Sequence, residues 1–292
     1  MPSPIASIPP EILGHIFFLV SEETLTVPSH ELTTLFHVTQ TCSTWRAIVL
    51  RHPRLWADLN IHLRSWSDRS TINAASLCLQ YSSNVAQPPP LSIRIHIKQY
   101  LNYWESRTGI STPIFLIPHV TRIHKLSIYS PLLFTPLVFP RLTDLEVSTP
   151  GWDAHADMHI PALLGRSGST VTRLSVGCVP DWDWFALLEN TPRLEVLITE
   201  GTLPEGVMRG IALGRIGVAL KELRCAVVFR GIDILLEILE TRLQDTVKES
   251  VKVCLNVITN VSVRCVDFVP DELQWTRIQA LGPSVEVTIL VE

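Results

Sequence analysis

Cysteine, glycine and charged residues are all scarce in this chain, and each scarcity excludes a class of protein. Six cysteines in 292 residues, with no Cys-x-x-Cys pair, are too few for a disulfide-bonded scaffold. Thirteen glycines are too few for several phosphate-binding loops. Charged residues make up 18% of the chain, below the roughly 25% usual in soluble domains. Because 46% of the residues are hydrophobic, a large core is expected and intrinsic disorder is excluded for most of the chain.

The sequence also lacks a large excess of charge of either sign and lacks long hydrophobic runs. Twenty-four basic and 28 acidic side chains give a net charge of −4, so no basic field favours nucleic acid or an anionic membrane. The longest apolar runs, such as 16–20, fall far short of the roughly 20 residues that span a bilayer. No Lys or Arg precedes an apolar core at the N-terminus, so we expect no secretory signal. These absences predict a soluble protein with reduced thiols, cytoplasmic and/or nuclear, without nucleic-acid or membrane partners.

Catalytic motifs are missing as well. The segment 165–170 has the glycines and hydroxyls of a phosphate-binding loop but not its lysine. Neither a G-x-S-x-G elbow nor an H-E-x-x-H helix occurs. Nothing in the sequence assembles a nucleophile, a base and an orienting group. We therefore expect no enzyme activity and no cofactor.

Two acidic clusters are the exceptions to weigh. In 153–159, two carboxylates accompany His155 and His159, which would share one face of a helix and could ligate a metal. The neighbouring Pro150-Gly151 and Pro161 instead favour a polar surface loop without metal. In Asp181-Trp182-Asp183-Trp184, paired carboxylates stand beside aromatics, but an acid at a helix start explains them more simply. This second interpretation places Trp184 and Phe185 inward.

The first 58 residues have helical periodicity. Apolar residues from Ile8 to Phe17 recur on one helical face after Ser7, which can cap the helix, and Pro9-Pro10-Glu11 suit a first turn. A second stripe runs from Leu35 to Ile48, with Cys42, Trp45 and Ile48 expected in the core. Residues 59–97 form a transitional region, with strands predicted at 59–63 and 91–97 and a helix at 70–83. We interpret Pro88-Pro89-Pro90 as a rigid connector, although a polyproline ligand is the alternative.

A weak repeat begins near residue 115, with the template apolar-x-x-apolar-x-apolar. The steps between its central leucines are 19, 29, 23 and 26 residues, close to the periods of about 20–29 residues in leucine-rich repeats, where this motif forms the strand. Helix-like stretches at 182–189, 205–213 and 231–243 separate the motifs, and strands at 251–257 and 284–291 flank a helix at 271–281. The central leucines are Leu126, Leu145, Leu174, Leu197 and Leu223.

The predicted fold class is therefore α/β, with a small N-terminal helical domain at 1–58 and an irregular solenoid of strand–helix units at 59–292. Stacking is required because one strand–helix unit cannot bury its apolar face alone. An ordinary α/β domain with alternating elements is the alternative, since the asparagine ladder of regular leucine-rich repeats is missing.

Three blocks of the N-terminal region together resemble an F-box, in the form common to fungal F-box-like proteins. The first is Ile8-Pro9-Pro10-Glu11-Ile12-Leu13 with the apolar run that follows. The second ends in Cys42-Ser43-Thr44-Trp45-Arg46, and the third is Pro53-Arg54-Leu55-Trp56. The chain departs from the family at Ile8, where leucine is usual, and in the long interval from Val20 to Leu32.

The resemblance implies a module that docks on the Skp adaptor of a cullin–RING ubiquitin ligase. A helical unit of this size cannot bury all its apolar side chains itself, so an exposed edge is expected. The residues that the resemblance and this argument assign to Skp-adaptor binding are Ile8, Pro9, Ile12, Leu13, Ile16, Leu35, Val38, Leu55 and Trp56.

The repeat body would then bind a protein substrate through strand positions that flank the central leucines. Their mixed charge suggests a protein or peptide and not a polyanion. These positions are Lys125, Tyr129, Asp144, Glu146, Arg173, Glu200, Glu222 and Arg224. The expected function is the substrate-recognition adaptor of an SCF-type ligase, linked to a cullin through the Skp adaptor. A leucine-rich scaffold that never joins a ligase is the alternative, and an enzyme using the Asp/His or Asp/Trp cluster is a third hypothesis.

Overall fold

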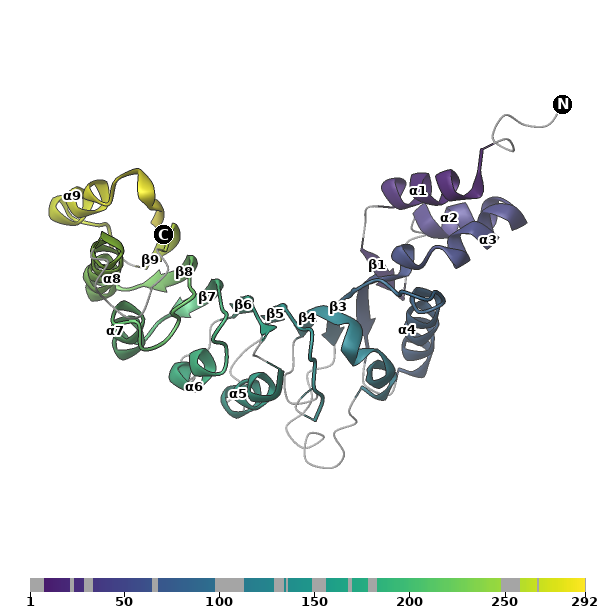
Figure 1. Cartoon of the computed structure of the whole chain (residues 1–292), viewed down its shortest axis with the longest axis horizontal. Coiled ribbons are helices and arrows are strands. Elements are labelled where there is room, and N and C mark those ends of the chain that lie inside the picture. The colour runs from purple at the N-terminus through teal and green to yellow at the C-terminus, as the bar shows by residue number, and fades with distance from the viewer. Residues whose placement is uncertain are drawn as a thin grey trace. The chain divides into compact units, whose positions relative to one another are not determined.

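Helices form the first part of the chain and parallel strand–helix units form the rest (Figure 1). The computed structural model describes residues 8–21, 24–28, 34–64, 68–97, 113–128, 134, 136–148, 156–167, 170–177, 183–247, 258–266 and 268–291. They belong to two compact units, Met1–Ile128 and Tyr129–Glu292. The predicted α/β class, with helices first and strand–helix units after them, is confirmed. The predicted domain boundary after residue 58 stays a prediction.

The helices of the first unit are set by local signals. Pro9 and Pro10 start α1, which has no side-chain cap, while Cys42 caps α3 through its Sγ, which accepts a hydrogen bond from the Trp45 amide at 3.4 Å. Cys42 is exposed, so its predicted place in the core is wrong. The extended backbone of His52 ends α3 ahead of a proline. The helices are α1 (Pro10–Val20), α2 (Thr34–Thr41), α3 (Ser43–Arg51) and the 3₁₀ helix η2 (Pro53–Trp56).

Four parallel strands of the first unit pair in chain order. They are β1 (Leu25–Val27), β2 (Asp58–Leu63), β3 (Leu91–Ile97) and β4 (Ile123–Ile128), with α4 (Arg69–Ser82) and the 3₁₀ helix η4 (Ile114–Arg122) between them. Strand β1 comes from the long interval between α1 and α2, where Leu25 pairs with Leu59. The N-terminal helical segment therefore supplies the first strand of the sheet.

Alternation along these strands separates core from surface. Leu59, Ile61 and Leu63 of β2 are fully buried, and the residues between them are not. Asp68 caps α4, since its carboxylate accepts a hydrogen bond from the Thr71 amide, and the helix buries Ala75 and Leu79.

Six parallel strands of the second unit also follow chain order. They are β5 (Asp144–Val147), β6 (Arg173–Val176), β7 (Val196–Thr202), β8 (Glu222–Val227), β9 (Asn260–Cys265) and β10 (Glu286–Val291). Helices α5 to α8 follow one another along one face of these strands (Figure 1). The helices are α5 (Ala156–Ser167), α6 (Trp184–Glu189), α7 (Glu205–Ala212), α8 (Phe229–Val247) and α9 (Glu272–Ala280), followed by the 3₁₀ helix η7 (Gly282–Ser284).

The repeat found in the sequence corresponds to a register across these strands. Leu145 pairs with Leu174, Leu174 with Leu197, and Leu197 with Leu223. All four are fully buried, so the motif marks the core position of each strand. The same row continues into Val261 of β9, where the sequence motif did not extend.

Three sequence predictions about this unit need correction or lie outside the described residues. Residues 156–159, expected in a loop, belong to α5, which buries Ile160, Leu163 and Leu164 despite Pro161. Phe185, expected to pack inward, is 42% exposed, whereas Trp184 is buried. The strand predicted at 251–257 lies outside the described residues.

A buried guanidinium joins α7 to α8. Arg242 is 1% exposed and donates hydrogen bonds to the Ile211 carbonyl at 2.8 and 3.1 Å and to the Gly217 carbonyl at 2.9 Å. Burial lowers the pKa of Arg242 to about 10. These carbonyls lie at the end of α7 and in the turn that follows it, and each also accepts a backbone amide, from Gly214 and Leu220 respectively. The guanidinium therefore adds donors that fix the turn after α7 against α8.

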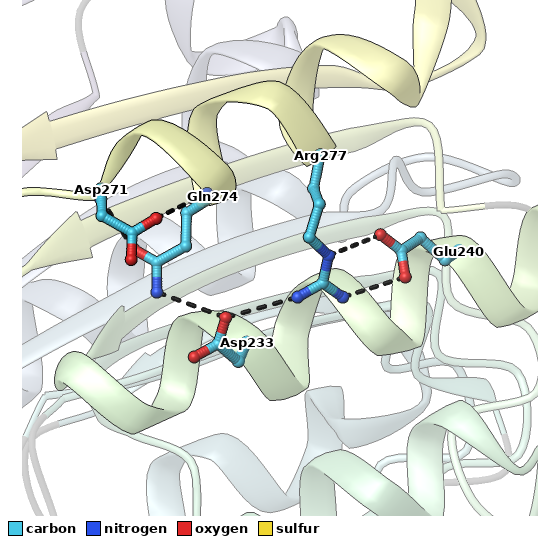
Figure 2. Close-up of polar contacts among 5 residues, drawn as sticks. All are labelled: Asp233, Glu240, Asp271, Gln274 and Arg277. Atoms are coloured by element: carbon cyan, nitrogen blue, oxygen red, sulfur yellow. Dashed lines mark hydrogen bonds and ion pairs between the residues drawn. The ribbon is translucent and has the colours of Figure 1, made fainter.

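A polar cluster fastens α9 to α8 (Figure 2). Arg277 donates two hydrogen bonds to the Glu240 carboxylate, at 2.8 and 2.9 Å, and a third to Asp233 at 3.3 Å. The same Asp233 oxygen accepts from the Gln274 side chain at 3.3 Å. Gln274 in turn forms a reciprocal capping box with Asp271 at the start of α9. Hydrogen bonding to Glu240 raises the pKa of Arg277, with Coulombic attraction to Glu240 and Asp233 acting in the same direction.

Candidate docking surface on the N-terminal helices

Helix α1 is apolar on both its buried and its exposed side. Leu13 and Phe17 are 6% and 4% exposed and face the unit's own core, while Ile12 and Ile16 are 53% and 39% exposed. The exposed residues Ile12, Ile16, Leu19 and Val20 recur at helical spacing and form what we call the apolar α1 face. Such a stripe on a water-exposed helix makes this face a candidate interaction surface.

Close packing against α3 holds α1 in place. A Cβ atom added at Gly14 would lie 2.8 Å from Cδ2 of His52 and 3.6 Å from the Ile48 side chain, so only glycine permits this approach. The rings of Phe17 and Trp45 lie 5.0 Å apart between centroids, in a tilted arrangement typical of aromatic pairs. The apolar α1 face is therefore presented on a fixed support.

The predicted docking residues separate into exposed and buried sets. Pro9, Ile12 and Ile16 are exposed and Ile8 is half-buried. The buried residues, which pack within the chain itself, are Leu13, Leu35, Val38, Leu55 and Trp56. In this structure the buried set supports the surface but offers little area to a partner. The assignment of all nine to Skp-adaptor binding stays a prediction.

Trp56 shows what the buried set does. Its indole N–H donates a 3.0 Å hydrogen bond to the Val49 carbonyl at the end of α3, and its ring lies 5.2 Å from that of Tyr81 on α4. One side chain thus joins the N-terminal helices to the first strand–helix unit.

His52 is a titratable group within this packing, since its ring is beside Gly14 and lies 6.2 Å from the ring of Phe18. Burial lowers the pKa of His52, and the positive charges of Arg54 and His15 lower it further. A neutral imidazole is suited to the apolar contact with α1 that Gly14 permits. Glu11 is the only carboxylate of α1, so the exposed side of this helix is weakly charged.

The predicted substrate-face residues lie on the strands as expected, and Tyr129 lies outside the described residues. Lys125 is exposed on β4, and Glu146, Glu200 and Arg224 are exposed on β5, β7 and β8. Asp144, Arg173 and Glu222 are partly exposed. Two ion pairs occur within this set, Arg173 with Asp144 at 3.9 Å and Arg224 with Glu222 at 2.7 Å.

Sequence reasoning missed several surface residues. On α1, Leu19 and Val20 continue the exposed stripe, and their spacing of seven and eight from Ile12 was the available signal. On the first unit's strands, Asn60, His62, Arg94 and His96 alternate with buried residues. Strict alternation in β3 was enough to place Arg94 and His96 on the polar face.

Reactive thiols, metal sites and membrane-spanning helices are the remaining features to consider among the described residues. Burial raises the pKa of Cys78 and of Cys225 to about 12, which keeps both thiols protonated and unreactive. Within the described ranges, no three His, Cys, Asp or Glu side chains gather as a metal site, and Asp153 and His155 lie outside those ranges. No helix in the described part of the chain is both long and apolar enough to cross a membrane.

Comparison with known protein families agrees with this geometry. The family model described as F-box-like matches residues 5–62, which include α1, α2, α3, η2 and most of β2. Residues 5–62 therefore form an F-box-like domain, in agreement with the resemblance found in the sequence. A search of the curated proteins found no match to the chain.

Proposed function

We propose that this protein is the substrate-recognition adaptor of an SCF-type cullin–RING ubiquitin ligase. In this role the F-box-like domain docks on the Skp adaptor, and the strand–helix units bind a protein substrate. The proposal includes no catalytic step, because other subunits transfer ubiquitin, and it places the protein in the cytoplasm and/or nucleus.

The observation that carries the proposal is the apolar α1 face. Ile12, Leu19 and Val20 are each more than half exposed on a helix whose other side is already packed. Burying a Leu, Ile or Val side chain contributes about 1.5–3 kcal/mol, so completing the burial of these half-exposed groups is worth several kcal/mol. An adaptor that covers the face gains that free energy, and a few such side chains dominate the affinity of many interfaces.

The direct test is co-purification of the full chain with a Skp adaptor. Replacing Ile12 and Leu19 together by Asp introduces charge into the apolar α1 face without touching the buried side of the helix. We expect this variant to lose the adaptor. The matched control is Leu213→Asp with Val228→Asp, because these residues are 61% and 53% exposed in the second unit. Equal capture of both variants, or no capture of the unaltered chain, contradicts the proposal.

Ligase membership needs a second measurement. Reconstitution with the Skp adaptor, a cullin and a RING subunit should recruit the protein to the cullin. Adaptor binding without cullin recruitment supports the scaffold hypothesis instead.

A further inference from the structure

We propose that the polar face of β2, β3 and β4 binds an acidic, extended peptide segment of a protein partner. The basic β2–β4 surface, as we call it, consists of His62, Arg94, His96 and Lys125. The proposal rests on the proposed function in one respect, since it names the chemistry of the substrate.

Strand register brings these side chains together. Arg94 of β3 lies opposite Asn60 of β2 and Ser127 of β4. Lys125 of β4 lies opposite Ser92, which precedes Arg94 by two residues on β3. His62 and His96 are also register partners, and their rings stack with centroids 4.6 Å apart and planes 13° apart. Because neighbouring strands are about 4.8 Å apart, the four side chains occupy one small area.

The permanent positive charges of this surface belong to Arg94 and Lys125. No ion pair in the described part of the chain includes Arg94 or Lys125, and both residues are exposed. Asp58 is the one carboxylate among the described residues of this face of β2, β3 and β4. The surface is therefore positive within a chain whose net charge is −4.

On the strands of the second unit, the positive side chains are engaged and some of the carboxylates are not. Their polar face has three arginines, and each is engaged: Arg173 with Asp144, Arg224 with Glu222, and Arg264 with the Glu200 carbonyl at 2.7 Å. The carboxylates of Glu146 and Glu286 form no ion pair among the described residues. Complementary charge directs an acidic segment to the basic β2–β4 surface and away from this second face.

Geometry favours an extended peptide over a nucleic acid. Ser92, Arg94 and His96 are alternate residues of β3, so they are spaced about 6.6 Å apart, as are alternate side chains of an extended partner. Duplex DNA binding depends mainly on Lys and Arg contacts to many phosphates, and this surface has only Arg94 and Lys125 for that role.

The experiment measures fluorescence anisotropy of a labelled peptide of alternating Glu and Gly added to the full chain, with a Gln–Gly peptide and duplex DNA as comparison ligands. We expect the Glu–Gly peptide to bind and the Gln–Gly peptide not to bind. Replacing Arg94 and Lys125 together by Gln should weaken binding roughly ten-fold, since each exposed charge pair contributes up to about 1 kcal/mol. The control is Arg69→Gln, which removes an exposed charge from α4, and its affinity should stay within about two-fold.

Three results would overturn the proposal: no binding of the Glu–Gly peptide, equal loss in the Arg69→Gln control, or preference for DNA. The outcome is independent of adaptor capture. Binding of the acidic peptide without binding of the Skp adaptor would support the proposed surface and contradict the proposed ligase role. Binding of the adaptor without binding of the peptide would support the ligase role and contradict the proposed surface.

Discussion

The buried indole N–H of Trp56 donates a 3.0 Å hydrogen bond to the backbone carbonyl of Val49. That carbonyl also accepts from the His52 amide at 3.1 Å, where α3 ends. Two donors therefore fix the turn that leads from the F-box-like helices into β2.

Replacing Trp56 by Phe should lower the free energy of unfolding by about 1–2 kcal/mol. Phenylalanine retains most of the ring packing against Tyr81 but loses the hydrogen bond, whose net contribution is about 1 kcal/mol, and leaves a small cavity. Urea denaturation followed by fluorescence of the remaining tryptophans measures the change. A variant as stable as the unaltered protein would show that the hydrogen bond contributes nothing.

Two glycine-to-alanine changes should have opposite effects. Alanine at Gly14 would place a Cβ atom 2.8 Å from the His52 ring, so the ring or α1 must shift and stability should fall by about 1–3 kcal/mol. Gly165 in α5 is the matched control, because a Cβ atom there meets nothing closer than 3.5 Å, at Asn190. Alanine at that position should raise stability by up to about 1 kcal/mol through helix propensity. Thermal melts of both variants test the pair, and a shift of the same sign in both contradicts the close-packing argument.

Stability should fall as the pH is lowered below about 6.5. Burial lowers the pKa of His52 and of His119 in the folded state, with nearby positive charge adding to the effect. The unfolded chain therefore binds these protons first, and stability is complete above the unfolded pKa and decreases below it. Urea midpoints at about pH 7.5 and about pH 5.5 should differ less for a His52→Gln, His119→Gln variant than for the unaltered chain. The exposed His37, replaced by Gln, is the control that should leave the difference unchanged.

Breaking the cluster between α8 and α9 should loosen α9 before the rest of the unit. Glu240→Gln removes the charge that accepts two hydrogen bonds from Arg277, and because both groups are partly exposed we expect a loss of about 1 kcal/mol. Amide hydrogen exchange should accelerate in α9 and not in α7. Uniform acceleration in both helices would instead indicate that the cluster stabilises the whole unit. The matched surface control is Glu205→Gln, whose ion pair with Arg209 joins residues of α7 alone.

Much of this fold could be predicted because the sequence repeat marks the residues that are buried in successive strands. Leu145, Leu174, Leu197 and Leu223 were found from spacing alone, and they occupy one buried row. Strand β1 was missed because three residues are too short for periodicity to show, and its pairing with β2 is a tertiary contact. Helix α5 was missed because Pro161 and Gly165 are ordinarily loop signals, and packing of Leu163 and Leu164 overrides them.

The docking surface was predicted in kind but not in detail. Periodicity places Ile12, Leu13 and Ile16 on one side of a helix, yet it does not indicate which part of that side the neighbouring helix covers. The close approach at Gly14 turns Leu13 inward and leaves Ile12 and Ile16 outside. The basic β2–β4 surface required strand register, because Arg94 and Lys125 are 31 residues apart in sequence.

Pairing of β2 with β3 has a practical consequence for the design of fragments of this protein. The family match ends at residue 62, inside β2. A fragment that ends there would lose β3, which pairs with β2 at Leu59 and Ile61, and would expose the apolar edge of β2 to water. We therefore expect that the F-box-like domain does not fold as an isolated fragment. A stable fragment must extend at least through α4 and β3, and we expect a fragment that ends at residue 62 to aggregate.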